Sequence, residues 1–416
     1  MSPVGPGSQV SFIIQKPGQI GIGGLGTEVF FRSPEILEAA FFLRREGASF
    51  LREVSMSFLQ SEIKDFVTKN YFRIIDHAFS NDDRTYDKFV TSRQLQNMAN
   101  ALALSRLFTP PASLHLFPLV TVEIREPLKG SVASLWSVDQ LADEFASESI
   151  YSGLDPTFFP PLPDKRPLQH RPLSWLGVRS PAKEAARKAR NAVLGAVQLK
   201  LSHRYRYLWT GREVFGGWCE INDGRVTYSI SDKLTPSLSD DVILAEQEKA
   251  WFRELDRLLA SSQSADIRAR KGLEYYYRSW FLTESDRFPV LCMALDALYG
   301  DVAAATQSLI NGIQDTLLAP ADETRLRLMI KLRASVIHGG APDVYESSKY
   351  EKYYRDYGVN PIKDMEVLVA ECFRRKVFNG SIEANLDPYA DVIKAEQEAG
   401  RFPLNLHDDL IVAGGS

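Results

Sequence analysis

An arginine and a histidine stand close together where an apolar segment ends. Arg333 and His338 are followed by Gly339, and residues 323–338 have the apolar spacing of a helix that such a glycine would stop. A histidine exchanges a proton near neutral pH, and a guanidinium holds phosphate. The pair therefore suits phosphodiester transesterification, in which RNA supplies its own 2′-hydroxyl as nucleophile and no metal is required.

The spacing of this pair also allows a purely structural interpretation. Five helical residues place Arg333 and His338 about 140° apart around the axis and about 7.5 Å along it, unlike the shared face of a helical metal pair. In the structural alternative, His338 caps the negative end of the helix and Arg333 pairs with a bundle carboxylate such as Asp296. A second pair, Arg401 and His407, spans a proline that breaks any helix.

A basic segment, residues 179–212, is the second candidate for chemistry. Lys183, Arg187 and Arg190 recur at i, i+4 and i+7, which places them on one helix face. Arg204 and Arg206 alternate with aromatic residues immediately afterwards. Since cations hold phosphates while aromatic rings stack unpaired bases, these five residues are candidate RNA contacts. The alternative is a solvated helix face followed by an amphipathic strand.

Two other patterns argue against cofactors. The glycine-rich residues 21–26 precede residues 27–31, which favour a strand, whereas a phosphate-binding loop needs a helix there. Cys219, Cys292 and Cys372 are odd in number and lack CxxC spacing, which argues against a disulfide framework or a zinc module and favours a reducing compartment. We expect neither a cofactor nor a metal.

Composition narrows the class of protein further. The 416 residues are 44% hydrophobic and 25% charged, which is typical of a globular chain of two or three domains. The net charge of −4 means that a nucleic-acid partner would have to meet a local basic patch. No apolar run of membrane-spanning length and no secretory leader is present, so we expect a cytoplasmic protein without a membrane partner.

The elements that must position these residues differ between the two halves of the chain. Residues 1–235 predict a mixed α/β sensing or targeting region with short strands, several helices and a proline-rich strap at 156–181 that excludes a helix or an interior strand. Residues 236–400 predict a helical bundle, and 401–416 a tail. The fold class is thus α+β. The expected elements are strands at 10–14, 29–31 and 114–126, a hairpin at 217–230, and helices at 86–107, 181–201, 244–259, 265–282, 285–299, 302–317, 323–338 and 361–378, with another starting at 33.

The C-terminal region, about residues 240–380, resembles the HEPN superfamily and most closely its Apea-like branch. The resemblance rests on the Arg-x4-His-Gly ending at 333–339, on the acid-containing segment 295–299 and on the aromatic segment 275–277. It implies a helical bundle that dimerises and places the Arg/His motifs of two protomers around one cleft. It also implies metal-independent endoribonuclease activity that leaves a 2′,3′-cyclic phosphate, in antiviral or toxin-like roles. Many members carry a polar residue directly after the arginine, whereas this chain has Ala334.

The leading hypothesis is therefore a HEPN-type endoribonuclease that acts on single-stranded RNA as a homodimer. Arg333 would bind the scissile phosphate, His338 would act as general acid and base, and Asp296 would orient one of them. The alternative is a non-catalytic HEPN-like module that binds a nucleotide or RNA, or that serves dimerisation. In a third hypothesis the basic segment is itself the RNA-binding surface.

Overall fold

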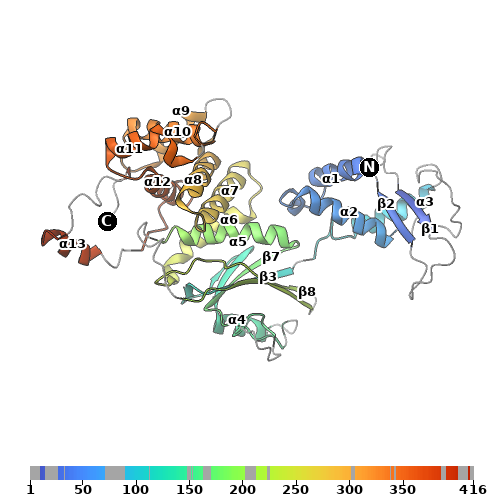
Figure 1. Ribbon diagram of the computed structural model, residues 1–416. Helices are drawn as coiled ribbons and strands as arrows, with labels where there is room; N and C mark the ends of the chain where they lie inside the picture. The colour runs from blue at the N-terminus through green and yellow to red at the C-terminus, as the bar shows by residue number, and fades with distance from the viewer. Residues whose placement is uncertain are drawn as a thin grey trace. The chain divides into compact units, whose positions relative to one another are not determined.

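The computed structural model describes most of the chain, which forms two compact units. Residues 1–113 with 180–186 form the first unit, and residues 114–179 with 187–416 form the second. Figure 1 shows the elements of both. The described residues are 10–14, 27–31, 33–70, 90–111, 113–147, 151, 153–162, 170–201, 212–222, 225–300, 305–337, 339–341, 343–385, 390–401 and 411–412.

The first unit combines a strand pair with three helices. Strands β1 (Val10–Ile14) and β2 (Thr27–Phe31) pair antiparallel, as the β-branched and aromatic runs predict. The glycine-rich residues 21–26 lie outside the described residues. The residues that follow them form strand β2 rather than a helix. Helix α1 (Ser33–Glu46) begins at the predicted start, and it is followed by η1 (Ser49–Arg52), α2 (Met56–Asn70) and α3 (Ser92–Ala103).

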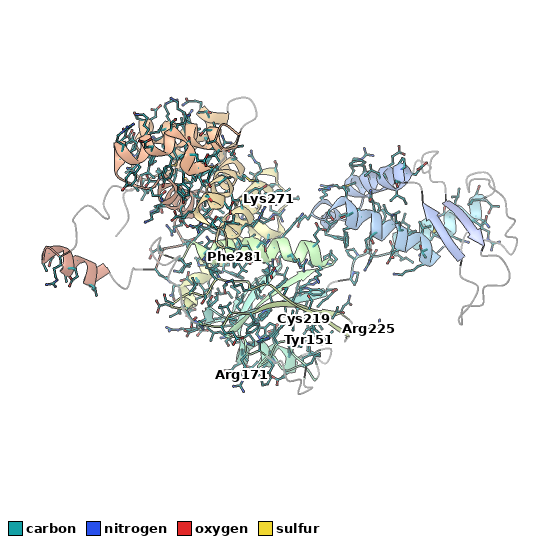
Figure 2. All side chains as sticks on the ribbon, viewed as in Figure 1. Tyr151, Arg171, Cys219, Arg225, Lys271 and Phe281 are labelled. Carbon is teal, nitrogen blue, oxygen red and sulfur yellow. The ribbon has the colours of Figure 1, made fainter. Side chains whose placement is uncertain are left out.

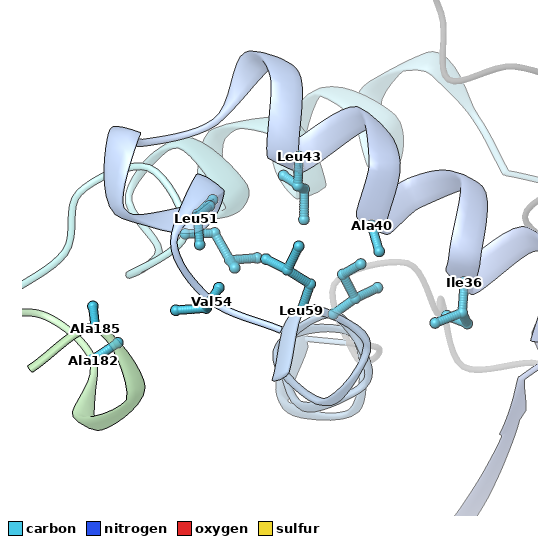
Figure 3. Packing of buried hydrophobic residues seen from close by; sticks show 10 residues of the cluster. Ile36, Ala40, Leu43, Leu51, Val54, Leu59, Ala182 and Ala185 are labelled. Atoms are coloured by element: carbon cyan, nitrogen blue, oxygen red, sulfur yellow. The ribbon is translucent and has the colours of Figure 1, made fainter. Parts of the chain in front are cut away.

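The core of this unit is built from one face of α1. Ile36, Ala40 and Leu43 follow the i, i+4, i+7 spacing of a single helix face and are buried against Leu51 and Leu59 (Figure 3). Ala182, directly before α5 (Lys183–Gln198), and Ala185, in its first turn, complete this core. The first turn of α5 therefore belongs to the first unit, although the rest of the helix belongs to the second.

A six-stranded sheet forms one part of the second unit. Its order is β5-β6-β7-β3-β8-β9, so strands distant in sequence become neighbours. The hairpin of β8 and β9 is confirmed, with Asn222 paired to Arg225 across the predicted Asp-Gly turn. The strands are β3 (Ser113–Leu119), β5 (Leu128–Lys129), β6 (Ala133–Ser137), β7 (Ser174–Ser180), β8 (Gly216–Asn222) and β9 (Arg225–Ser231).

Helices cover both faces of this sheet. Helix α4 (Val138–Ser147) lies on one face, over a core that contains Trp136 and Trp175. Helix α5 lies on the other face, where the Arg190 guanidinium is 5.2 Å from the centre of the Phe117 ring (Figure 1). The sheet is therefore the middle layer of three, and α5 is the layer nearest the helical bundle.

The bundle forms the rest of the second unit, which confirms the α+β fold class. Helix α8 (Glu284–Tyr299) contacts α7, α9, α10 and α12 and is the central helix. Apolar residues at helical spacing predicted most of these helices, whereas α11 and α13 were not predicted from the sequence. The other elements are η6 (Glu246–Glu248), α6 (Lys249–Ala260), α7 (Ser264–Ser279), α9 (Ala305–Thr316), α10 (Glu323–Ile337), η7 (Val344–Glu346), α11 (Ser348–Tyr357), α12 (Pro361–Lys376) and α13 (Ala390–Glu398).

The C-terminal end of α5 attaches the sheet to the bundle. Arg374 of α12 donates to the Leu199 carbonyl at 3.1 Å through Nε and 2.6 Å through Nη2. Lys200 forms a buried ion pair with Glu248 at 2.9 Å. A Cβ on Gly195 would lie 2.3 Å from the Leu273 carbonyl oxygen of α7, so only glycine permits this close helix crossing. The boundary predicted at residue 235 marks where helical apolar spacing becomes continuous along the sequence. In the structure, the sheet and the bundle are in contact and belong to one compact unit.

Three sequence expectations are corrected in this unit. Residues 174–180, inside the proline-rich strap at 156–181, form the interior strand β7, because the neighbouring prolines lie outside this run. Residues 114–126 form two strands rather than one with a wet face: β3 is buried throughout, and β4 (Val122–Ile124) pairs with β10. Strand β10 (Val242–Leu244) also occupies the start of the helix expected at 244–259, which begins at Lys249 instead.

A carboxylate holds the β5–β6 turn against α6, and removing its charge should destabilise the protein at neutral pH. Asp256 accepts hydrogen bonds from the backbone amides of Ser131, Val132 and Ala133, at 2.7, 2.8 and 3.2 Å. Burial raises the pKa of Asp256, but these bonds outweigh it and hold the pKa below its usual value. We expect Asp256→Asn to lower the free energy of unfolding by about 1–3 kcal/mol at pH 7.

The pH dependence of this loss has a definite sign. A depressed pKa stabilises the fold above the unfolded-state pKa, about 3.9, and this contribution disappears as the pH falls through the folded-state value. The difference in the free energy of unfolding between wild type and Asp256→Asn should therefore become smaller below about pH 4. Urea unfolding followed by tryptophan fluorescence measures it, since all six tryptophans fall in the second unit. Glu254→Gln, in an exposed pair with Arg257 on the same helix, should change stability by less than about 0.5 kcal/mol.

Candidate active site

The candidate active site lies where α10 crosses α8. Arg333, in the last turns of α10, donates from Nη2 to Oδ2 of Asp296 on α8. The two side chains are 18% and 31% exposed, so the pair is at the surface while remaining partly desolvated. Asp296 is thus the partner of Arg333, as the sequence suggested. This pairing fits both the structural hypothesis and the catalytic hypothesis in which Asp296 orients the guanidinium.

The inner side of the Arg333 side chain covers the bundle core. Its Nε is buried and has no hydrogen-bond partner among the described residues. It borders an apolar cavity of about 10 Å³, room for about one water molecule, which Cys292 and Met329 also line. A guanidinium has five N–H donors. The bond to Asp296 uses one of them, so the group keeps donors for an added anion.

The end of α10 is organised by a cap and by a serine pair. Ile337 is the last helical residue, and Gly339 has φ of +72°, which confirms the predicted left-handed stop. Ser335 Oγ lies 2.9 Å from Ser347 Oγ, the residue that caps α11. His338 lies outside the described residues, so its geometry relative to Arg333 stays a prediction. What the structure gives is the end of α10 at Ile337, the residue directly before His338.

Exposed apolar side chains flank the ion pair. Met293 stands three residues before Asp296 on α8 and is 37% exposed. Ile337 stands four residues after Arg333 on α10 and is 42% exposed. Residues three or four apart share a helix face, so both apolar groups lie beside the charged pair. Sequence reasoning missed this rim, because helical spacing alone does not tell which faces neighbouring helices leave uncovered.

The basic segment is only partly presented to solvent. Arg187 is exposed, whereas Lys183 and Arg190 are half-buried. Arg190 lies over Phe117, donates to Asn191 Oδ1 at 2.6 Å, and has its pKa lowered by burial. The predicted helix face therefore does not form one open row of three cations, because α5 is covered by the sheet. Arg204 and Arg206 lie outside the described residues.

Metal ligands, membrane-spanning helices and reactive thiols would be other functional features of the part of the chain that the structure describes. There, no three His, Cys, Asp or Glu side chains are grouped as metal ligands, and no helix is long and apolar enough to cross a membrane. Cys219, Cys292 and Cys372 are free and buried. Burial raises the pKa of the Cys219 and Cys372 thiols to about 12, which makes them poor nucleophiles at neutral pH.

One further surface combines cations with an aromatic ring. Arg268, Lys271, Tyr275 and Arg278 of α7 lie at i, i+3, i+7 and i+10, and the structure leaves this face exposed or half-exposed. Lys271 Nζ lies 4.9 Å from the centre of the Tyr275 ring. Figure 2 labels Lys271 on α7. We call these four residues the α7 stripe. Their spacing was present in the sequence, so a search for basic residues beside aromatic ones would have found them.

The comparisons with known proteins add nothing to this geometry: no protein-family model, no curated protein and no solved structure matches the chain.

Proposed function

We propose that this chain is a cytoplasmic, metal-independent endoribonuclease of HEPN type with an antiviral or toxin-like role. The observation that carries the proposal is the partly exposed ion pair between Asp296 and Arg333, the second of which lies on the helix that His338 directly follows. An arginine fixed by a carboxylate is a preorganised donor for a phosphate. A histidine five residues later in the chain supplies a side chain that exchanges protons near neutral pH.

The chemistry assigns one role to each side chain. His338 takes the proton of the 2′-hydroxyl as its oxygen bonds to phosphorus, and an imidazolium protonates the 5′-oxygen as the P–O5′ bond breaks. Arg333 donates to the non-bridging oxygens, whose negative charge grows in the transition state. Asp296 acts on Arg333 alone, as a positioning residue. The products are a 2′,3′-cyclic phosphate and a 5′-hydroxyl.

A second copy of the chain is the proposed partner of the α8–α10 face. Met293 and Ile337 supply an apolar rim around the ion pair, and buried apolar groups around a charged centre are typical of protein interfaces. Pairing two such faces would bring two Arg–His sets to one cleft. It would also answer the difficulty that helical spacing predicts Arg333 and His338 on different sides of one helix axis.

A non-catalytic module that binds RNA or dimerises is the competing function. It is favoured by the same ion pair, because the Asp296 carboxylate already neutralises the guanidinium. The two functions differ in turnover. A binding module retains RNA without cutting it, whereas the enzyme releases a new 5′-hydroxyl end.

Labelled single-stranded RNA tests the proposal directly. In the presence of EDTA, the full chain should cut an all-ribose oligonucleotide and leave a 2′,3′-cyclic phosphate. The same oligonucleotide with 2′-deoxyribose throughout should stay intact, because it lacks the nucleophile. Protein with His338→Ala, purified in the same way, serves as the blank for contaminating nucleases, and His407→Ala is the matched histidine control. Cleavage of the deoxy substrate, or equal cleavage by the His338→Ala protein, would refute the enzyme.

A further inference from the structure

Helix α7 carries two arginines that have no acidic partner among the described residues. Arg268 and Arg278 are exposed, and no described acidic side chain pairs with either. The acidic residues of the same helix are already engaged: Asp266 pairs with Arg257 of α6 at 3.1 Å, and Glu274 pairs with Lys271 at 2.9 Å. The outward side of α7 therefore keeps two uncompensated positive charges in a chain whose net charge is −4.

The aromatic member of the stripe stands between these charges. Tyr275 is half-exposed and lies seven residues after Arg268 and three before Arg278. The Lys271 ammonium lies over its ring. Tyr276 and Tyr277 beside it are only 4% and 6% exposed, so the core uses these two tyrosines and leaves the third outside. An outward tyrosine between arginines offers a π-face and phosphate-binding groups together.

The stripe also leads to the candidate active site. Arg268 Nη1 donates to the Gly300 carbonyl at 3.3 Å, at the C-terminal end of α8. Gly300 is one turn beyond Asp296 and donates its amide to the Asp296 carbonyl at 2.8 Å. One end of the stripe is therefore about one helical turn, about 6 Å along α8, from the acid that holds Arg333. The other end, Arg278, lies about 15 Å further along α7.

We propose that the α7 stripe binds the single-stranded RNA that enters the candidate active site, with a base stacked on Tyr275 and the flanking phosphates held by Arg268 and Arg278. A base that stacks on this ring displaces the Lys271 ammonium, which then faces the adjoining phosphate. The inference rests on the proposed function for the identity of the ligand. It assigns a contact surface that neither the Arg–His motif nor the basic segment at 179–212 supplies.

Binding measured without cleavage tests the stripe. All proteins carry His338→Ala, and the probe is a fluorescein-labelled oligouridine in EDTA at increasing KCl. Arg268→Gln with Arg278→Gln should weaken binding about tenfold at physiological salt and lower the salt slope by about 1.4, since each phosphate contact with a single strand contributes about 0.7. Tyr275→Ala should weaken binding about 5- to 150-fold without changing the slope, and Tyr275→Phe should restore it.

Matched variants separate the stripe from general effects. Arg225→Gln removes an exposed arginine from the edge strand β9, and Tyr354→Ala removes a 58% exposed tyrosine from α11. Neither should change binding. The inference is overturned if Arg225→Gln weakens binding as much as the stripe variants, if Tyr275→Ala binds like its parent, or if duplex RNA binds as tightly as the single strand. Should Arg333 variants cut RNA normally while stripe variants still lose binding, the proposed chemistry fails and the stripe stands.

Discussion

Replacing Asp364 with alanine is expected to lower the free energy of unfolding by about 3–5 kcal/mol, the usual effect of removing one partner of a buried ion pair. Asp364 is completely buried on α12. Its Oδ2 accepts from Nε of Arg325 at 2.9 Å, and also from Arg325 Nη2 and the Tyr353 hydroxyl. Its Oδ1 accepts from the Ile411 amide at 3.1 Å.

The size of this effect follows from what remains behind. Arg325 is itself buried on α10, with its side chain 8% exposed, and its guanidinium lies 4.9 Å from the centre of the Tyr357 ring. Without Asp364, a charged group stays desolvated and loses its anion. One carboxylate thus joins α10, α11, α12 and the chain at Ile411, so its loss loosens the helix that carries Arg333.

Urea unfolding followed by tryptophan fluorescence measures this loss in the second unit. Asp364→Asn keeps the shape and part of the hydrogen bonding, and should therefore be destabilised by less than Asp364→Ala. Asp356→Ala is the matched control, because Asp356 forms an exposed i, i+4 pair with Lys352 at 2.6 Å on α11. It should change stability by no more than about 0.5 kcal/mol. Equal midpoints for Asp364→Ala and Asp356→Ala would show that the buried network does not stabilise the bundle.

The second large effect concerns the reaction. Arg333→Ala is expected to lower the rate of RNA cleavage by about 10²–10³, the range found when a preorganised donor to a developing oxyanion is removed. Arg333→Lys keeps the charge but not the planar fork that grips two phosphate oxygens, so its rate should fall between those of Arg333→Ala and wild type. Single-turnover cleavage of labelled RNA gives the rate without the product-release step.

A control on the same helix distinguishes chemistry from folding. Arg327 is exposed on α10, where it pairs with Glu323, and Arg327→Ala should cut at the wild-type rate. Asp296→Asn should lower kcat with little rise in KM, because the proposed mechanism has Asp296 orient Arg333 without touching the substrate. If Asp296 only stabilised the fold, Asp296→Asn would instead leave kcat per folded molecule unchanged. An Arg333→Ala protein that is folded and cuts at the wild-type rate would end the assignment of Arg333.

Local sequence signals determined much of the helical half. The apolar spacing at 285–299 and 323–338 predicted α8 and α10 within a residue at each end, because one helix face must be buried whatever packs on it. The stop at Gly339 and the hairpin across Asn222 and Arg225 were equally local, since both depend on backbone preferences of a few residues.

Proline was a weaker guide than these signals. It restricts its own residue and the one before it, so a proline-rich range did not exclude a strand in the proline-free interval 174–180. The central position of β7, between β6 and β3, depends on pairings between segments far apart in the chain. No local pattern contains that information.

The candidate site shows the same division. From the sequence alone came the Arg–His motif, the acid at 296 and the expectation that α5 carries a basic row. Only the tertiary structure decided that Asp296 meets Arg333, that Arg190 turns onto Phe117, and that Tyr275 stays outside while Tyr276 is buried. The reason is physical: helix and turn formation depend on neighbours along the chain, whereas exposure and ion pairing depend on which distant surfaces pack together and exclude water.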